Sequence, residues 1–181
     1  LFGGVVLSST IESYAYCSLT GREDSKVVVS DENNNIRQEV DYVDSLQGEG
    51  EFSLVKATAN RFSLKHGFEV SLRYDAPPGA GLGSSSALCV SLIGVFKEWK
   101  GTSMTDYDIA NLAYEVERND VGIPGGMQDQ YASTFGGFNL IEFKKEATIV
   151  NPLRIKRDIL HELEYNSLLC FTGKTRRSGG I

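Results

Sequence analysis

The sequence has few of the residues that build disulfide frameworks or zinc sites. Among its 181 residues are three cysteines, Cys17, Cys89 and Cys170, and two histidines, His66 and His161. The cysteines are odd in number, far apart and each inside an apolar segment, which predicts buried thiols and no disulfides. Because neither histidine lies near a cysteine pair or near the other histidine, a structural zinc site is not expected.

Long apolar runs and clusters of positive charge are also missing. No stretch of about 18 or more apolar residues occurs, so we expect no membrane-spanning helix. The opening LFGGVVLSS lacks the positively charged region of a secretory signal, and a cytoplasmic protein is the default expectation. Lys and Arg total 18 against 24 Asp and Glu, a net charge of −6, without a Lys/Arg-rich run. This balance disfavours nucleic-acid binding.

The apolar pattern predicts many short strands. The composition, with 41% hydrophobic residues, suits one globular domain or slightly more. GGVVLSS, SYAYCSLT, KVVVS and IRQEV are rich in β-branched and aromatic residues, and the polar DENNN predicts a hairpin turn between the last two. We therefore expect the chain to open as a meander. FNLIEF, ATIVN and SLLCFTG are three later strand candidates.

Helical spacing alternates with these strands. It predicts helices over 51–65, over 84–99 and over 105–118, and the last of them begins with Thr105 and Asp108 spaced as in a capping box. FEVSLRYD, between the first two helices, predicts a half-buried strand. Since strands and helices are mixed without a regular βαβ repeat, the fold class is α+β.

The segment PPGAGLGSSSA, residues 77–87, is the strongest chemical signal. It places three alternate glycines between a predicted strand and a predicted helix that opens with three serines. Glycine at such density is used where the backbone bends sharply or something approaches it closely. The start of the helix directs unpaired N–H groups and the positive end of a dipole at one point, which favours an anion, above all phosphate.

Other nucleotide motifs do not fit. A Walker A loop needs Gly-Lys-Ser/Thr, which the loop at 77–87 lacks, and the third glycine of a Rossmann fingerprint would fall on Ser84. CFTGKTRRSGG contains GKT, but Leu168 occupies the position of the first required glycine. The plain alternative is a glycine-rich surface turn before a serine-capped helix, which would need fewer glycines.

Two segments resemble a known family. PPGAGLGSSSA resembles the second signature of the GHMP small-molecule kinases, which include galactokinase, homoserine kinase and mevalonate kinase. ERNDVGIPGGMQDQYASTFGGFN resembles the stretch that carries the acidic residues of the family's sugar kinases. VLSSTI and FTGKTR add to these a similarity to the bacterial D-glycero-D-manno-heptose 7-phosphate kinases. The resemblance implies a ribosomal protein S5 domain 2-like α+β fold.

The resemblance also implies the roles of residues in an ATP- and Mg²⁺-dependent sugar kinase. Ser85 and Glu117 would bind Mg²⁺ through oxygen, and Asp129 would be the general base. From the residues alone, Glu117 could equally be a solvated carboxylate beside Arg118, and Asp129 could cap a helix. The ATP phosphates would lie on a longer stretch: Pro78, Gly79, Ala80, Gly81, Leu82, Gly83, Ser84, Ser85 and Ser86.

The acceptor is expected to be a small sugar or sugar phosphate. The anomeric hydroxyl of heptose 7-phosphate is the first expectation, with Gly126, Thr175 and Arg176 as substrate-binding residues; the last two could also belong to an ordinary charged loop. Fucokinase, galactokinase and a non-catalytic module that binds ATP or sugar are alternatives. A structural S5-like domain for RNA or protein contacts is disfavoured by the acidic balance.

The extent of the chain is a further expectation. Family members begin with a strand and an RISF-x-GGGTD-like segment, and they end with a second domain that carries a third glycine-rich signature. Neither is found in this sequence. Residues 1–181 are therefore expected to be the N-terminal, ATP-binding and catalytic domain, truncated at its N-terminus and without most of the C-terminal domain.

Overall fold

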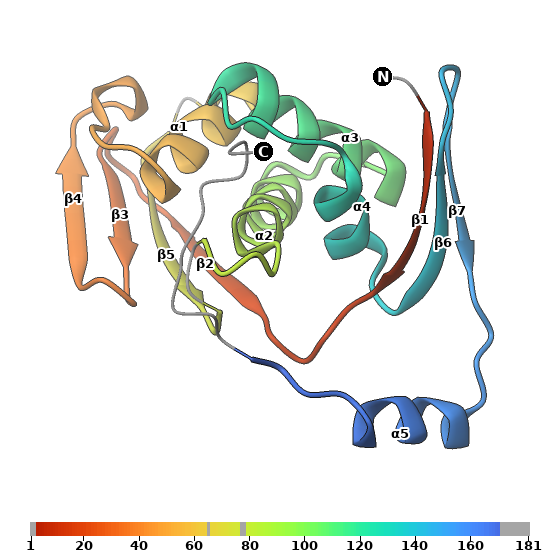
Figure 1. Cartoon of the computed structure of the whole chain (residues 1–181). Coiled ribbons are helices and arrows are strands. Elements are labelled where there is room, and N and C mark those ends of the chain that lie inside the picture. The colour runs from red at the N-terminus through yellow and green to blue at the C-terminus, as the bar shows by residue number, and fades with distance from the viewer. Residues whose placement is uncertain (1–2, 65, 77–78, 171–181) are drawn as a thin grey trace.

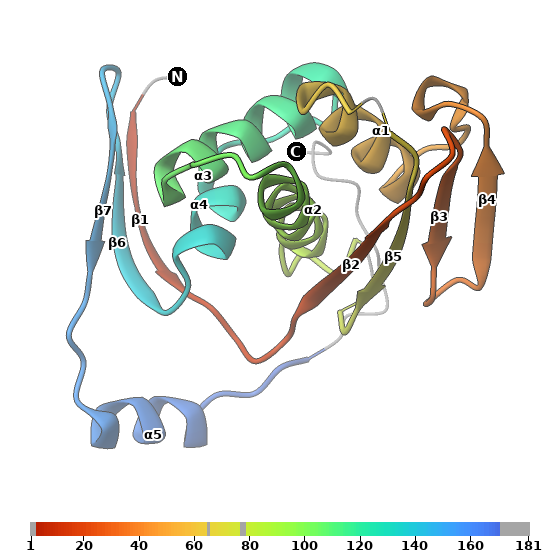
Figure 2. The same ribbon diagram turned by 180° about the vertical axis from the view of Figure 1, so that it is seen from behind.

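The protein has α-helices between two β-sheets (Figures 1 and 2). The structure, a computed structural model, describes residues 3–64, 66–76 and 79–170. The elements in chain order are β1 (Gly4–Ser9), β2 (Ala15–Gly21), β3 (Val27–Asp31), β4 (Ile36–Val40), the 3₁₀ turn η1 (Val43–Ser45), α1 (Glu51–Arg61), β5 (Phe68–Tyr74), α2 (Ser84–Lys100), α3 (Asp106–Glu115), the π-helical turn η2 (Val116–Asp120), α4 (Gln128–Phe135), β6 (Phe138–Phe143), β7 (Thr148–Pro152) and α5 (Arg157–Tyr165). The predicted α+β class is confirmed.

The two sheets differ in strand direction. One has the order β2-β5-β3-β4, in which β3 and β5 are parallel and the other pairs antiparallel; the other sheet, β1-β6-β7, is antiparallel throughout. The predicted meander is wrong, because of the first four strands only β3 and β4 form a hairpin. Strand β5 lies between β2 and β3, and its alternate residues Phe68, Val70 and Leu72 are buried in the main core.

The main core lies between α1, α2 and one face of the four-stranded sheet. Helix α2 packs on β2 and on all three neighbouring helices, so most of its surface is covered, as its apolar sequence predicts. A smaller cluster joins α3 and α4 to the three-stranded sheet through Ala110, Tyr131, Ile141 and Val150. Among the described residues no helix is both long and apolar enough to cross a bilayer.

The helix ends follow their sequence signals. Gly101, with φ of 66°, ends α2 in the left-handed conformation that glycine tolerates. The predicted capping box at α3 is present: Thr105 Oγ1 accepts from the Asp108 N–H, and the Asp108 carboxylate accepts from the Thr105 N–H at 2.8 Å. Helix α3 then passes into η2, so helical structure continues to Asp120, close to the predicted end.

The C-terminal part differs from the prediction. The sequence predicts a strand at residues 167–173, but residues 167–170 form no strand and 171–173 lie outside the described residues. Helix α5, which precedes them, was missed, and none of its residues is buried. Of the cysteines predicted to be buried, Cys89 is buried and Cys17 half-buried, whereas Cys170 is exposed.

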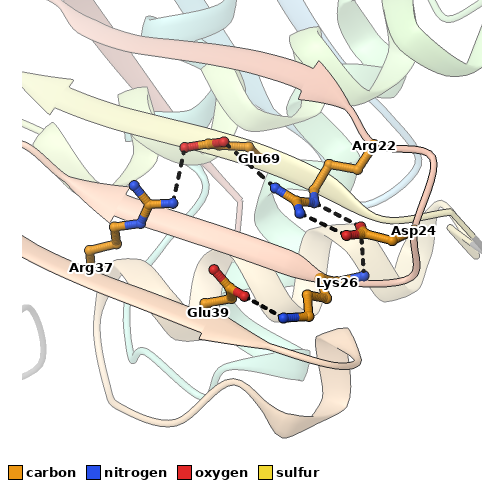
Figure 3. A network of polar contacts seen from close by, with 6 residues as sticks. All are labelled: Arg22, Asp24, Lys26, Arg37, Glu39 and Glu69. Atoms are coloured by element: carbon orange, nitrogen blue, oxygen red, sulfur yellow. Dashed lines mark hydrogen bonds and ion pairs between the residues drawn. The ribbon is translucent and has the colours of Figure 1, made fainter.

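An ion-pair network covers the outer face of the four-stranded sheet (Figure 3). Val28 is fully buried although it points away from the side of Val27 and Val29. Its direct neighbours in the ladder are Glu39 on β4 and Glu69 on β5. These two acids, each held in an ion pair, flank Val28 on a face over which the described residues form no second layer. The network consists of Arg22, Asp24, Lys26, Arg37, Glu39 and Glu69.

Candidate functional site

The glycine loop turns the chain from β5 into α2. Gly79, Gly81 and Gly83 have φ of 78°, 78° and 72°, a region that residues with a Cβ rarely enter. The predicted reason for glycine at these three positions is therefore confirmed. Pro78 lies outside the described residues. Gly83 is also the N-cap of α2, and the first turn of this 17-residue helix contains no acidic residue, so its N–H groups and dipole are available to an anion.

Glu117 lies at the start of α2 although it is 32 residues away in sequence from Ser85. It is 1% exposed and accepts hydrogen bonds from the Ser85 hydroxyl (2.7 Å, to Oε1) and the Ser86 hydroxyl (2.6 Å, to Oε2). A third bond comes from Gln130 Nε2, also to Oε2. The interpretation of Glu117 as a solvated carboxylate is wrong, because this carboxylate is buried among neutral donors.

The π-helical turn η2 carries Glu117. This turn is defined by the hydrogen bond from the Val121 N–H to the Val116 carbonyl at 2.9 Å. The two residues are five positions apart, whereas the partners in an α-helix are four apart. Such a turn holds one more residue than an α-helical turn and often lies at functional sites. The Glu117 carbonyl in turn accepts from the Ile123 N–H at 2.8 Å, so the backbone on both sides of η2 is tied down.

Asp129 lies in the first turn of α4, against the glycine loop. A Cβ added to Gly83 would lie 3.7 Å from Asp129 Cβ and Cγ, so this loop and this carboxylate are in contact distance. The alternative that Asp129 caps α4 is wrong, because the N-cap is Met127 and no side-chain cap bond is formed. The structure therefore brings the predicted base next to the predicted phosphate loop.

Arg118 holds the loop between η2 and α4. Its guanidinium donates to the Ile123 carbonyl at 3.0 Å and twice to the Gly126 carbonyl, at 3.2 and 3.1 Å. A Cβ on Gly125 would lie 2.8 Å from Arg118 Nη2, so a side chain at this position would push the guanidinium away from its partners. This role of Arg118 was missed, because nothing in the sequence indicates that its partners are carbonyl groups.

These residues line one cleft of about 710 Å³. Ser84, Ser85, Glu117, Arg118 and Asp129 contribute to it from one side. Residues from the start of α1 and from the end of β5, including Glu51, Ser53 and Tyr74, contribute from the other. Gly126 is not in the lining, and its carbonyl is occupied by Arg118, so its role in substrate binding stays a prediction. Thr175 and Arg176 lie outside the described residues.

Tyr74, which lines the cleft, is fixed by the β3–β4 turn. Asn33 pairs with the Tyr74 backbone through Oδ1 (2.9 Å) and Nδ2 (2.8 Å), and Asn34 Nδ2 donates to the Tyr74 hydroxyl at 2.8 Å. Burial raises the pKa of Tyr74 to about 12, with further contributions from Glu51 and Asp31. The phenol is therefore neutral, and the turn that the sequence predicts only as a hairpin also anchors the last residue of β5.

The donor set at Glu117 fits Mg²⁺. Among the described residues no group of three or more His, Cys, Asp or Glu side chains could hold a metal ion. One buried carboxylate and one serine hydroxyl are hard oxygen ligands, and Mg²⁺ commonly takes one or two carboxylates while phosphates and water fill its other positions. A cation bound at this place would offset the free-energy cost of burying the charge of Glu117.

Comparisons with known proteins agree with this geometry. Residues 52–137 match the family GHMP kinases N terminal domain. The chain is 44% identical to the D-glycero-alpha-D-manno-heptose 7-phosphate kinase of Campylobacter jejuni, an alignment that covers 99% of this chain and 55% of that protein. A galactokinase of Thermotoga maritima is 27% identical over 74% of this chain and 38% of its own length.

A solved structure is also similar. The crystal structure of a D-glycero-D-manno-heptose 1-phosphate kinase from Bacteriodes thetaiotaomicron superposes with a TM-score of 0.82 and 39% identity, over 90% of this chain and 55% of that one. The chain thus spans about half the length of these heptose-phosphate kinases. Its family match, its overall similarity and its fold agree, and the chain belongs to the GHMP kinase family.

Proposed function

We propose that the protein is an ATP- and Mg²⁺-dependent kinase that transfers the γ-phosphoryl group of ATP to a hydroxyl of a sugar phosphate. The observation that carries the proposal is the meeting of three groups in one cleft. These are the glycine loop at the start of α2, the buried Glu117 carboxylate bonded to Ser85, and Asp129 against Gly83. A phosphate-binding surface, a cation site and a base are the parts that phosphoryl transfer requires.

The residues have separate tasks in this proposal. The N–H groups between Gly79 and Ser86 would bind the phosphates of ATP, helped by the dipole of α2. Ser85 and Glu117 would hold Mg²⁺, which when bound neutralises charge on the β- and γ-phosphates. Asp129 would accept the proton of the acceptor hydroxyl. The hydroxyl oxygen then bonds to the γ-phosphorus, the bond from this phosphorus to the β–γ bridging oxygen breaks, and ADP leaves with the electron pair.

We further propose D-glycero-D-manno-heptose 7-phosphate as the acceptor, phosphorylated at its anomeric hydroxyl to the 1,7-bisphosphate. Support comes from the heptose-phosphate kinases, whose 44% and 39% identities over most of the chain exceed the 27% of the galactokinase. The names of these two relatives place the phosphate of the substrate at different positions, 7 and 1, so the two heptose phosphates must be compared directly.

The test is Mg-ATP-dependent ADP release by the full-length protein. The acceptors are heptose 7-phosphate, heptose 1-phosphate, fucose, galactose and mannose, each tested with and without EDTA. We expect turnover with heptose 7-phosphate that EDTA abolishes. Turnover with galactose or fucose alone would replace the acceptor but keep the chemistry. ATP binding without ADP release from any acceptor would contradict the kinase proposal and favour the non-catalytic module.

A further inference from the structure

We propose that Gln130 is a positioning residue for the metal site: it holds one oxygen of the Glu117 carboxylate so that the other oxygen, together with the Ser85 hydroxyl, faces the cation. The inference rests on the proposed function, because it concerns the same Mg²⁺ site. It adds a residue that neither the sequence motifs nor the chemistry of phosphoryl transfer identifies.

The two oxygens of Glu117 have unequal surroundings. A carboxylate has about four acceptor positions, two on each oxygen. Oε2 accepts from Ser86 and from Gln130, which are 3% and 0% exposed. Oε1 accepts from Ser85 alone, a half-buried residue that lines the cleft. Among the described residues Oε2 therefore has both positions filled on the buried side, and the open position belongs to Oε1.

An uncharged donor suits this task. The amide N–H of Gln130 donates to Glu117 without bringing a positive charge, whereas a lysine or arginine at this place would compete with the metal. The orientation has a cost, because Gln130 Oε1 is buried and finds no hydrogen-bond partner among the described residues. A buried acceptor without a partner destabilises the fold, so stability alone does not account for an amide at this position.

The first turn of α4 connects the positioning residue with the base. Asp129 and Gln130 are consecutive, so their side chains leave the helix about 100° apart. Asp129 lies against Gly83, while Gln130 reaches Glu117 on η2. One helical turn therefore orients both the group that would take the proton and the carboxylate that would hold the metal.

The test measures metal binding separately from turnover. Mn²⁺ replaces Mg²⁺, a non-hydrolysable ATP analogue saturates the nucleotide site, and free Mn²⁺ is followed by electron paramagnetic resonance on the full-length protein. Gln130→Met keeps the length of the side chain but removes the donor. We expect its Kd for Mn²⁺ to rise by about 10- to 100-fold, with little change in metal-free binding of the analogue.

The chain offers a matched control and a second variant. Gln128 lies on the same turn of α4 but is exposed, so Gln128→Met should keep the wild-type Kd. Ser86→Ala removes the other donor to Oε2 with a smaller loss of packing, and it should also weaken Mn²⁺ binding if Gln130→Met does not fold. Thermal unfolding of each variant separates loss of fold from loss of positioning.

The outcomes separate this inference from the proposed function. Folded Gln130→Met with the wild-type Kd for Mn²⁺ overturns the role of Gln130, while the kinase proposal stands. If Gln130→Met is unfolded, a wild-type Kd in Ser86→Ala shows that filling both positions of Oε2 is not needed to orient the carboxylate, and the inference then loses the observation on which it rests. Absence of Mn²⁺ binding to the wild-type protein with the analogue overturns the metal site and with it this inference. A higher Kd in the folded variants, with Gln128→Met unchanged, supports it.

Discussion

Acidic side chains differ in exposure and in their partners between the two sides of the four-stranded sheet. On its outer face Asp24, Glu39 and Glu69 are each between 41 and 46% exposed and paired with arginine or lysine (Figure 3). In the cleft Glu117 is 1% exposed, and its donors are two serines and an amide. The acids of the outer network are paired with bases of the protein itself, whereas Glu117 has hydrogen bonds but no ion pair with any residue in the ranges 3–64, 66–76 and 79–170.

The energetic consequences are also opposite. Exposed ion pairs contribute little to stability, because both charges are well solvated when they are apart. A buried carboxylate without a cation costs free energy, and proteins keep such groups mainly where function needs them. Substitutions in the cleft should therefore change activity strongly and stability little. Substitutions on the sheet face should lower stability slightly and leave activity unchanged.

The largest effect is expected for Asp129→Asn. The amide keeps the shape of the side chain beside Gly83 but cannot accept the proton, so turnover should fall by about 10²- to 10⁴-fold. Binding of ATP should change little, because the phosphate loop and Glu117 are intact. Initial rates of ADP release and titration with a fluorescent ATP analogue measure the two quantities. Comparable turnover in the variant would refute the assignment of the base.

Glu117→Gln is expected to separate activity from stability. Loss of a metal ligand should reduce Mg²⁺-dependent turnover by roughly 100-fold or more. The metal-free variant should melt at the wild-type temperature or above it, because an uncompensated buried charge is removed. An amide oxygen in the place of Oε2 can still accept from Ser86 and Gln130, and the new amide N–H can donate to the Ser85 hydroxyl oxygen. Calorimetry without metal measures this. A clearly lower melting temperature would mean that Glu117 mainly stabilises the fold.

Gly125→Ala tests a third kind of charged site, in which backbone carbonyl groups hold the guanidinium of Arg118. The new Cβ would displace the Arg118 guanidinium from Ile123 and Gly126, and it would also be strained by the φ of 156° at Gly125. Overpacking of this kind costs about 1–3 kcal/mol. Urea unfolding measures the loss. Gly126→Ala is the matched control, since nothing lies within 4 Å of a Cβ there, and its change should stay within about 0.5 kcal/mol. Equal losses in both variants would contradict the role of Arg118.

The smallest effect is expected on the sheet face. The hydrogen bond from Arg22 is the main cause that lowers the pKa of Asp24 from 3.8 to about 2. A lowered pKa means that the charged pair stabilises the protein above pH 4 and that this contribution disappears as the pH falls to about 2. Asp24→Asn should therefore melt slightly below the wild-type protein at pH 7, and the difference should vanish near pH 2.

The neighbouring acid provides the control for this pH dependence. Glu23 is exposed and makes no ion pair within the described part of the chain, so Glu23→Gln should follow the wild-type curve throughout. A constant difference between Asp24→Asn and the wild-type protein down to pH 2 would show that the ionised pair is not the cause. Melting temperatures by circular dichroism over this pH range are sufficient.

Local features of this protein were predictable from sequence. The glycine loop could be recognised because glycine is the usual residue at positions with positive φ, and three of them stand close together. The capping box of α3 could be recognised because Thr105 and Asp108 are three residues apart. The interpretation of Glu117 depended on the family resemblance. Its spacing of 32 residues from Ser85 contains no signal, because the contact is made by the packing of α2 against η2.

The pairing of strands that are far apart in the sequence could not be predicted from local pattern. The meander was predicted because successive strands usually pair. The insertion of β5 between β2 and β3 depends on contacts between segments far apart in the sequence, which local pattern does not contain. Helix α5 was missed although Ile159, Leu160 and Leu163 have the spacing of one helix face, a signal that was available in the sequence. Gln130 was overlooked because an amide beside Asp129 has no distinctive spacing; its only signal is a polar residue on the buried side of α4.

The π-helical turn has a consequence for how this chain can change by mutation. A turn with one extra residue is an α-helix carrying a single-residue insertion. Deleting one residue between Glu117 and Val121 would restore the regular spacing and lengthen α3, a change that local helix energetics favours. The same deletion would rotate everything after it by about 100° and take Arg118 and its loop out of register. A codon-length deletion at η2 should thus give a more regular helix but misplace the loop that Arg118 holds beside the cleft.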